Sequence, residues 1–211
     1  MASTKPSLRE SNFLSQRCSL TSLVSMHGKP RNAIRFLSSQ CQSSTMMNPS
    51  LAIYRGLKRA GIDFAASVPC VNLQELLDLV GKDPDIIHVP VTREEEGVGL
   101  CAGAWMAGRR PALLMQNSGI GNSINALASL DILYGIPLLI IISHRGGRGE
   151  PIVGQVPMGR LTVPLLDAMQ IPHLSPAHEE AEAVVKAAWD LAADGRKPAA
   201  VLLDLDFWRV A

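Results

Sequence analysis

Apolar positions after residue 47 follow two spacings that alternate along the chain. Leu51, Tyr54, Leu57 and Ala60 recur every three residues, as on one face of a helix, and Gly61 then ends that helix. Short apolar runs between such segments are typical of buried strands. The pattern predicts strands at 62–68, 86–91, 111–115, 137–143, 171–174 and 199–205, and helices at 51–60, 73–80, 94–107, up to about 134, from about 158, and at 179–193. This alternation favours an α/β fold with a doubly wound, mostly parallel sheet and helices on both faces.

Two of these segments have a distinctive composition. Residues 86–91 are β-branched and apolar on both faces, which predicts an interior strand of the sheet. The helix that begins near Glu94 contains a string of small residues, which lets another backbone approach it closely. Those residues are Gly97, Gly99, Ala102, Gly103, Ala104 and Ala107.

The first 46 residues differ in composition from the rest of the chain. They are rich in serine and contain six basic residues against one acid, Glu10. Such composition is typical of an organelle transit peptide. It is also typical of a disordered tail, or of sequence upstream of a start at Met46 or Met47. We therefore expect residues 1–46 to be a disordered or targeting-like extension, and residues 47–211 to be the folded domain.

Composition excludes several classes of protein. The chain has 211 residues, 47% of them hydrophobic, and a formal net charge of +1. With 4% aromatic residues and no basic excess, it lacks the features of a nucleic-acid binder. Its longest apolar run, 136–142, is far shorter than a bilayer requires, so we expect no membrane span.

The four cysteines, Cys18, Cys41, Cys70 and Cys101, show no paired metal spacing. Reduced thiols in a cytoplasmic protein are the simplest interpretation, and no metal site is expected in this chain. We expect Cys101 to lie in the core and Cys70, at a strand end, to be a weak candidate for lining a site.

The stretch from Gln116 to Asn125 is the most informative part of the sequence. It joins the apolar run 111–115 to a run of small residues, so a buried strand should turn here into a helix. Gly119 and Gly121 would permit a tight turn and the close approach of a ligand, and the flanking Asn and Ser side chains would cap the helix. A helix start at this edge of a parallel sheet favours anions. An ordinary strand-to-helix turn is the alternative interpretation.

Polar clusters follow four of the expected strands, at 69–72, 92–96, 116–125 and 143–150. Because parallel strands end at the same edge, these clusters should meet there. Successive helical residues diverge by about 100°, so Glu94, Glu95 and Glu96 cannot all face water. We expect Glu95 to lie against the small residues, and Glu94 and Glu96 to form a solvated helix start.

His144 lies beside two arginines in a glycine-rich loop. Together with Arg145 and Arg148 it offers donors for an anionic ligand. The alternative is an edge histidine that is satisfied by its own protein neighbours.

Two motifs resemble the pyrimidine-binding domain of thiamine-diphosphate decarboxylases. They are Thr92 to Gly99 with Gly103-Ala104-Trp105, and Met115 to Asn125. The resemblance extends from Met47 to the C-terminus, and it is strongest to the sulfopyruvate decarboxylases of coenzyme M biosynthesis, with phosphonopyruvate decarboxylases next. It implies thiamine diphosphate as cofactor and decarboxylation of a small anionic 2-oxo acid.

The resemblance also implies roles for particular residues. A glutamate at the position of Glu95 would bind N1′ of the aminopyrimidine, and burial would raise its pKa. The related pattern has a Gly-Tyr-Ala-like segment nine to eleven residues later, here assigned to Ala104-Trp105-Met106. Asn117, Ser118, Gly119, Gly121 and Asn122 would also contact the cofactor. His144, as a catalytic residue, and Arg145 and Arg148 would bind the substrate.

One motif of complete thiamine-diphosphate enzymes is missing. Nothing resembles the Gly-Asp-Gly…Asn segment that holds Mg2+ and the diphosphate, and we expect Asp204 and Asp206 to lie inside the last strand. The resemblance therefore implies half of an active site. A separate diphosphate-binding beta subunit would hold the Mg2+, and the enzyme would be a hetero-oligomer.

Two other functions remain open on the sequence. A nicotinamide-dependent oxidoreductase could use Gly119-Ile120-Gly121 as a phosphate loop, but the third glycine and the acidic ribose ligand are missing. A non-catalytic assembly subunit could keep the fold without the chemistry. Retention of the glutamate beside the small residues argues against it.

Overall fold

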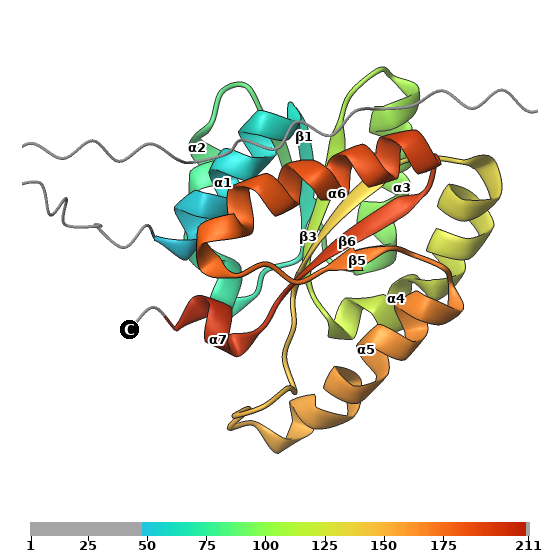
Figure 1. The fold of residues 1–211 in the computed structure, drawn as a ribbon. Helices are drawn as coiled ribbons and strands as arrows, with labels where there is room; N and C mark the ends of the chain where they lie inside the picture. The colour runs from blue at the N-terminus through green and yellow to red at the C-terminus, as the bar shows by residue number, and fades with distance from the viewer. Residues whose placement is uncertain (1–47, 210–211) are drawn as a thin grey trace, which may run out of the picture. The chain divides into compact units, whose positions relative to one another are not determined.

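The computed structural model describes residues 48–209, which form a six-stranded, entirely parallel sheet in the order β2-β1-β3-β4-β6-β5. Figure 1 shows this sheet with its helices. The strands are β1 (Phe64–Ser67), β2 (Ile87–Pro90), β3 (Pro111–Gln116), β4 (Leu138–Ser143), β5 (His173–Leu174) and β6 (Pro198–Leu203). The predicted doubly wound α/β fold is confirmed. The expected extension at 1–46 lies outside the described residues.

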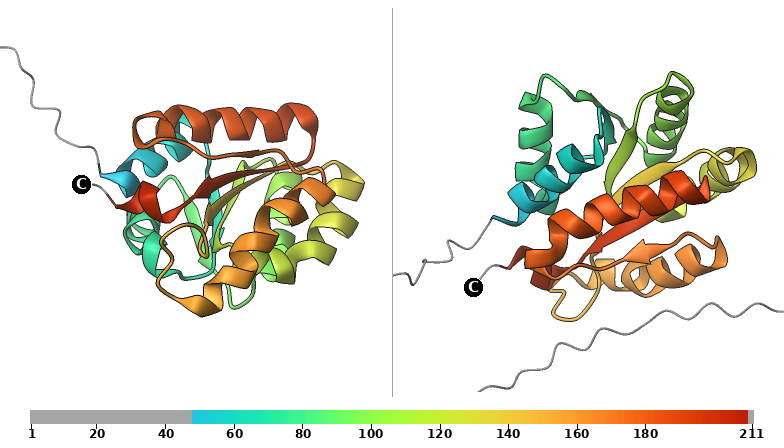
Figure 2. Two further views of the ribbon diagram at one scale, coloured as in Figure 1. Left: turned by 60° about the horizontal axis from the view of Figure 1, so that its bottom comes forward. Right: turned by 45° about the horizontal axis from the view of Figure 1, so that its top comes forward.

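Helices cover both faces of the sheet (Figure 2). On one face lie α1 (Pro49–Ala60), α2 (Gln74–Lys82) and α6 (Ala181–Gly195). On the other lie α3 (Glu94–Met106), α4 (Ser118–Ala126), its π-helical continuation Leu127–Ile132 and α5 (Val156–Ala168). The short helix α7 (Leu205–Trp208) follows β6. None of the helices in the described part of the chain is both long and apolar enough to cross a membrane.

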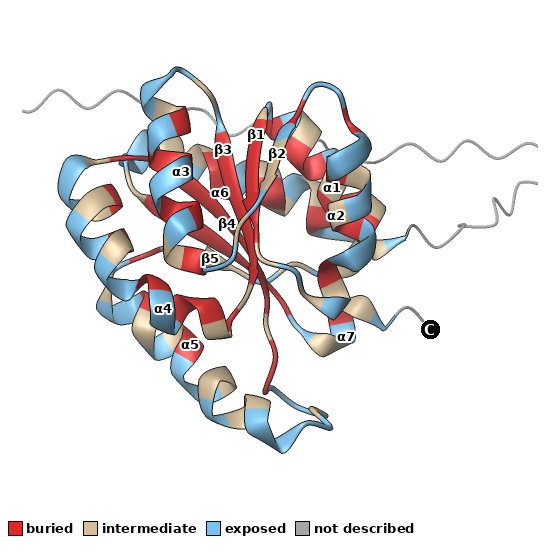
Figure 3. Cartoon of the chain, turned by 180° about the vertical axis from the view of Figure 1, so that it is seen from behind, coloured by how far each residue is buried: buried red, intermediate tan, exposed pale blue. Residues whose placement is uncertain are grey.

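Alternate residues of the central strands belong to two separate cores, and Figure 3 shows these strands as buried. In β3, Ala112 and Leu114 pack beneath α1 and α6, whereas Leu113 and Met115 pack beneath α3 and α4. Every residue of β4 and β6 is buried. Burial on both faces explains why these strands are apolar runs without polar alternation.

Helices α1 and α6 cross closely although they are far apart in sequence. A Cβ at Gly56 of α1 would lie 2.6 Å from the Cβ of Val185, so only glycine permits this approach. Arg59 Nη1 lies 3.4 Å from Glu182 Oε1, a pair separated by 123 residues. The first helix therefore depends on the last long one for its packing.

Residues 87–90 form an edge strand, so the prediction of an interior strand is wrong. Within residues 48–209, β2 pairs only with β1, and Ile87 is 45% exposed. A continuous apolar run is expected of an interior parallel strand, but here the outward side chain of Ile87 borders a surface groove beside α3.

The chain after β6 also departs from expectation. β6 ends at Leu203, so Asp204 and Asp206 do not lie inside a strand. Asp204 is the N-cap of α7, where its Oδ1 accepts a hydrogen bond from the backbone N–H of Phe207. Helix α5, expected from about residue 158, begins at Val156 and has 13 residues.

Asp131 is an unusual group within the second core. It lies in the π-helical segment, its side chain is fully buried, and neither carboxyl oxygen has a hydrogen-bond partner among the described residues. Burial raises its pKa to about 7. Burial raises the pKa of the Cys101 thiol on α3 to about 12, and the charge of Asp131 adds to this rise. The expected core position of Cys101 is confirmed.

Asp131→Asn is expected to stabilise the protein at high pH but not at low pH. The ordinary pKa of an aspartate is 3.8, so between about pH 4 and 7 the folded protein holds a proton that the unfolded chain has lost. The free energy of unfolding of the parent therefore falls as pH rises through this window. Denaturant unfolding at pH 4, 6 and 8 measures the difference. A difference between variant and parent that is constant over this range would contradict the prediction.

Candidate functional site

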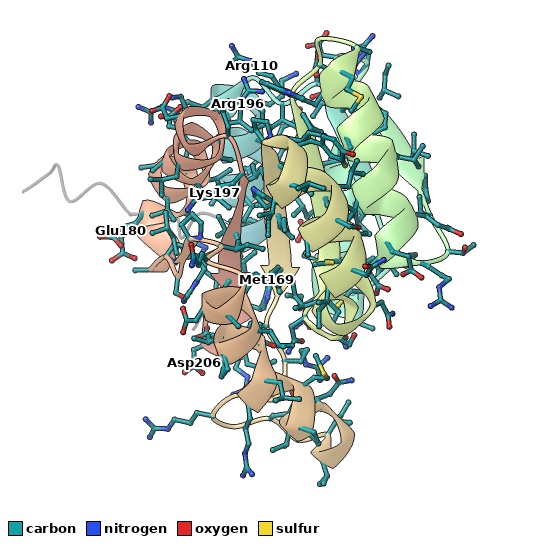
Figure 4. All side chains as sticks on the ribbon, turned by 90° about the vertical axis from the view of Figure 1, so that its right-hand side faces the viewer. Arg110, Met169, Glu180, Arg196, Lys197 and Asp206 are labelled. Atoms are coloured by element: carbon teal, nitrogen blue, oxygen red, sulfur yellow. The ribbon has the colours of Figure 1, made fainter. Side chains whose placement is uncertain are left out.

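The four polar clusters meet at the carboxyl edge of the sheet, as predicted. Asn72 Nδ2, after β1, donates a hydrogen bond to Ser143 Oγ at the end of β4 over 3.2 Å. The Cys70 thiol donates to Gln116 Oε1 over 3.7 Å. Figure 4 labels the opposite end of the sheet by Arg110 and Arg196, which precede β3 and β6.

Glu94 is the acid of the triplet that lies against the second motif. It is the first residue of α3 and is 8% exposed. Its Oε2 accepts a hydrogen bond of 2.9 Å from Asn122 Nδ2. A Cβ at Gly119 would lie 2.3 Å from Glu94 Cγ and 2.8 Å from its Oε1, so the side chain occupies the space that glycine leaves. The structure thus joins the two motifs through one carboxylate.

Gly119 and Gly121 lie inside helix α4 and not in a turn. Helix α4 begins at Ser118, directly after β3 and Asn117, and neither glycine has a positive φ. The expectation that these glycines form a tight loop is therefore wrong. Gly119 is needed because α4 packs on Glu94, whereas a Cβ at Gly121 would make only an ordinary contact with Met158 Cε at 3.7 Å.

Glu95 was expected to lie against the small residues, but one of its oxygens pairs with Arg93. Its side chain is 31% exposed, Oε1 forms an ion pair with Arg93 Nε, and Oε2 is buried without a hydrogen-bond partner among the described residues. Its own backbone N–H and the Arg93 guanidinium lower the pKa of Glu95, the opposite of the predicted rise. Glu96 Oε2 accepts from the backbone N–H groups of Thr92 and Arg93, which completes the helix start.

Asn117 is fully buried and links three elements of the site. Its Nδ2 donates to Arg145 O over 3.0 Å and to Thr162 Oγ1 over 2.9 Å, while its Oδ1 accepts from the backbone N–H of Arg145 over 3.0 Å. It makes no side-chain cap to α4, contrary to the predicted cap. These bonds fix the start of the loop that carries His144 and Arg145.

Arg145 is held by an acid in its own loop. Its Nε and Nη2 donate to the two carboxylate oxygens of Glu150 over 2.8 and 2.7 Å. Glu150 also accepts from the backbone N–H groups of Gly146 and Ile152. The Arg145 guanidinium, together with these N–H groups, lowers the pKa of Glu150 to about 2. Arg145 therefore closes the loop, and one bidentate edge of its guanidinium is already occupied by Glu150.

The remaining substrate candidates lie in the same loop. His144 is half-buried, with Nε2 3.2 Å from Gly159 O on α5. Arg148 is exposed. Gln116 Nε2 donates to Ser118 Oγ and to Gln155 Oε1, both over 3.0 Å, and so connects this loop to the start of α4. Neither this Gln116 link nor the contact between Asn72 and Ser143 was predicted.

The interval between the glutamate and the Gly-Tyr-Ala-like segment favours Glu94, and not Glu95, as the counterpart of the glutamate in the related pattern. In the related pattern the Gly-Tyr-Ala-like segment lies nine to eleven residues after the glutamate. Counted from Glu94, that interval contains Gly103, Ala104 and Trp105, which places a glycine where the pattern has one. Counted from Glu95, the same interval contains Ala104, Trp105 and Met106 and therefore no glycine.

Within residues 48–209 no group of three His, Cys, Asp or Glu side chains is placed to bind a metal. The donors present suit an organic group instead. Glu94 has one oxygen held by Asn122 and the other beside Gly119, where no side chain intervenes. A carboxyl group fixed in this way fits the ring nitrogen of an aminopyrimidine.

Comparison with known families defines the class of protein. Residues 47–158 match the family described as thiamine pyrophosphate enzyme, N-terminal TPP binding domain. The chain therefore belongs to this family of enzymes.

Two relatives match this chain over nearly their whole length. The chain is 52% identical over 163 residues to the sulfopyruvate decarboxylase subunit alpha of Methanococcus maripaludis, covering 77% of this chain and 98% of that protein. It is 53% identical over 163 residues to the subunit of the same name from Methanothermobacter thermautotrophicus, covering 77% and 99%.

Longer relatives contain the same domain as a part. The chain is 45% identical over 114 residues to the sulfopyruvate decarboxylase of Methanosarcina acetivorans, which corresponds to 54% of this chain but 29% of that protein. A solved structure, the 2-oxoglutarate:ferredoxin oxidoreductase of Magnetococcus marinus, matches with a TM-score of 0.62 at 20% identity, over 76% of this chain and 29% of its own. That likeness shows the fold alone.

Proposed function

We propose that this chain is the alpha subunit of a thiamine-diphosphate-dependent 2-oxo-acid decarboxylase that converts sulfopyruvate and a proton to sulfoacetaldehyde and CO2. The two relatives above, which the chain covers almost completely, support the substrate and the subunit role. The observation that carries the proposal is the carboxylate of Glu94, buried between the two family motifs and held by Asn122.

The chemistry explains why such a carboxylate is needed. A 2-oxo acid cannot lose CO2 directly, because the electron pair left on its carbonyl carbon has nowhere to delocalise. Thiamine diphosphate, when bound, supplies that electron sink. The chain's own contribution is proton control: Glu94 would share a proton with N1′ of the aminopyrimidine and so favour its imino form.

We assign this role to Glu94 in place of Glu95. Asn122 fixes the orientation of the Glu94 carboxyl, and Gly119, having no side chain, leaves room for it. Glu95 is paired with Arg93, and its lowered pKa makes it a poor proton donor. The backbones of Ser118 and Gly119 at the start of α4 would support the same ring, whereas Asn117 would act by positioning the neighbouring loop.

For the substrate, we propose that His144 and Arg148 provide donors for the carboxylate and sulfonate groups. Both lie in the loop that follows β4, at the same edge as Glu94. Arg145 would position this loop through Glu150 and would not itself be the main anion ligand. A phosphonate asks for similar donors, so phosphonopyruvate is the alternative substrate. The chain is 41% identical over 113 residues to the phosphonopyruvate decarboxylase of Streptomyces viridochromogenes, which supports phosphonopyruvate as the alternative substrate.

The other half of the active site would belong to a second subunit. The sequence has no counterpart of the diphosphate and Mg2+ motif, and the Methanosarcina acetivorans relative is more than three times as long as the part that matches. We propose that a beta subunit holds the diphosphate and Mg2+ and that the enzyme is a cytoplasmic hetero-oligomer. Residues 1–46 would then be dispensable for the chemistry.

The isolated chain is expected to fold but to lack decarboxylase activity. Activity should appear only when the second subunit, thiamine diphosphate and Mg2+ are added together, because the chain supplies only the pyrimidine side of the site. Aldehyde formation from sulfopyruvate and from phosphonopyruvate, measured as kcat/KM for each, tests both activity and preference. Turnover by the purified chain alone would contradict the half-site proposal.

A further inference from the structure

The backbone at His144 is anchored from two sides. The N–H of His144 donates to Leu203 O at the end of β6 over 2.8 Å. The next residue, Arg145, donates its N–H to Asn117 Oδ1, and its carbonyl accepts from Asn117 Nδ2, both over 3.0 Å. Because Asn117 is fully buried, water does not compete for these two bonds. The His144 side chain therefore leaves the edge of the sheet from a fixed position.

Two glycines bring a backbone carbonyl of α5 to the His144 ring. Gly146 has φ +83°, and a Cβ there would lie 2.9 Å from Gly159 Cα. A Cβ on Gly159 would in turn lie 2.5 Å from the carbonyl carbon of Gly146. Both positions require glycine, because the loop packs directly on the backbone of α5. With this contact in place, Gly159 O lies 3.2 Å from His144 Nε2.

The Gly159 carbonyl determines which nitrogen of His144 holds the ring proton. A carbonyl oxygen can only accept a hydrogen bond, so His144 Nε2 must be the donor. In a neutral imidazole the other nitrogen, Nδ1, is then an acceptor, and it becomes a donor only when the ring takes up a second proton. His144 Nδ1 makes no hydrogen bond within residues 48–209, and it is not one of the buried polar atoms there that lack a partner. Nδ1 is therefore the ring nitrogen that is open to a ligand.

We propose that Gly159 is a positioning residue that fixes the tautomer of His144, so that His144 contacts the 2-oxo acid through Nδ1. The inference rests on the proposed function, which places His144 at the substrate. To donate to an anionic group, His144 must carry its second proton on Nδ1, while the Nε2 proton stays on Gly159 O. The two ring nitrogens then have separate tasks: Nε2 holds the loop against α5, and Nδ1 binds the substrate.

The tautomer can be measured on the isolated chain, without partner or cofactor. 15N NMR of the imidazole rings at pH 8 distinguishes a protonated from an unprotonated nitrogen, and His144→Asn identifies the His144 signals by their loss. We expect neutral His144 to hold its proton on Nε2. His173 is the internal reference, because its Nδ1 lies 3.3 Å from Ile171 O and should therefore show the opposite tautomer. A proton on Nδ1 of neutral His144 would overturn the inference.

Two substitutions of His144 separate the tasks of its nitrogens. The amide of His144→Gln reaches the position of Nε2 and can still donate to Gly159 O, whereas the amide of His144→Asn reaches only the position of Nδ1. His144→Gln should therefore keep the melting temperature of the parent chain, and His144→Asn should lower it by roughly 2–4 °C. The KM for sulfopyruvate should follow the opposite order and be roughly 10-fold higher for His144→Gln than for His144→Asn. KM is measured in complexes with the second subunit of the Methanococcus maripaludis enzyme, whose alpha subunit is 52% identical to this chain.

A purely structural role of His144 would make KM follow the melting temperature, with His144→Asn the worse variant in both measurements. That result would overturn the inference, as would equal KM values for the two variants. His173→Gln, on the edge strand β5, is the control and should leave KM unchanged. If the parent complex does not turn over sulfopyruvate, the proposed function fails, and the NMR measurement still decides the tautomer. If the complex is active but neutral His144 is protonated on Nδ1, the proposed function stands and the inference fails.

Discussion

Glu94→Gln is expected to lower kcat of the assembled enzyme by roughly 100-fold or more. Glutamine keeps the size of the side chain and can still bond to Asn122, but it cannot share a proton with N1′. A 100-fold loss corresponds to about 3 kcal/mol of barrier, which is reasonable for a group acting on a proton transfer. Exchange of the cofactor's C2 proton in deuterated water reports on this step directly and should slow in parallel.

The neighbouring acids provide the controls for Glu94→Gln. Glu95→Gln removes an ion pair with the exposed Arg93, and we expect a change of no more than a few-fold in kcat. Glu96→Gln keeps an oxygen that can accept from the backbone of Thr92 and Arg93. If Glu95→Gln slows C2 exchange while Glu94→Gln leaves it unchanged, the assignment of the two residues is reversed.

Gly146→Ala is expected to destabilise the protein by roughly 3 kcal/mol. Gly146 has φ +83°, and a Cβ there would lie 2.1 Å from Gln155 O and 2.9 Å from Gly159 Cα. Both obstacles are backbone atoms, so the loop must move, and the positive φ adds its own strain. For a domain of this size the melting temperature should fall by roughly 6–12 °C. Activity should fall as well, because Gly146 follows the loop residues His144 and Arg145.

The adjacent glycine offers a matched control. Gly147 is exposed, has no positive φ, and a Cβ there would meet no atom within 4 Å. Gly147→Ala should therefore change the free energy of unfolding by less than about 0.5 kcal/mol. Thermal unfolding of Gly146→Ala and Gly147→Ala measures the difference in melting temperature between the two variants. Equal melting temperatures would show that the contact between Gly146 and α5 is not maintained in solution.

Much of the fold could be predicted because its layers leave periodic traces in the sequence. Strands buried on both faces, such as β4 and β6, have continuous apolar sequences. The helices between them have apolar residues at the spacing of one buried face. The order of strands is less visible. Residues 86–91 look interior because they are apolar, yet an apolar edge beside an uncharged helix gives the same pattern.

The polar clusters meet at the predicted edge of the sheet, but the acid that packs against α4 is Glu94, one residue before the acid that was expected there. Three consecutive acids lie at the start of α3, which begins at Glu94 as predicted, but their directions depend on how the helix is rotated against its neighbours. The structure turns the Glu94 side chain toward Gly119 and leaves Glu95 paired with Arg93. A shift of one residue is about 100° around a helix, which is enough to exchange a buried acid for an exposed one.

The role of Arg145 could not be predicted, for a different reason. An arginine in a glycine-rich loop suggests an anion site, and nothing in the sequence says that Glu150, five residues later, will fold back onto it. Loop closure depends on backbone angles that glycines permit, here at Gly146 and Gly149. Such angles leave no periodic pattern.

The contact between α1 and α6 has a consequence for the synthesis of the chain. Arg59 and Glu182 are 123 residues apart, so at roughly 5–20 residues per second α1 leaves the ribosome roughly 6–25 seconds before its partner helix does. During that interval the face of α1 that Gly56 and Val185 later close has no native partner. Until α6 is made, the apolar face of the amphipathic helix α1 lacks this part of its native packing. Stalling or truncation before residue 181 would leave a species prone to aggregation even though most of the sheet had been synthesised.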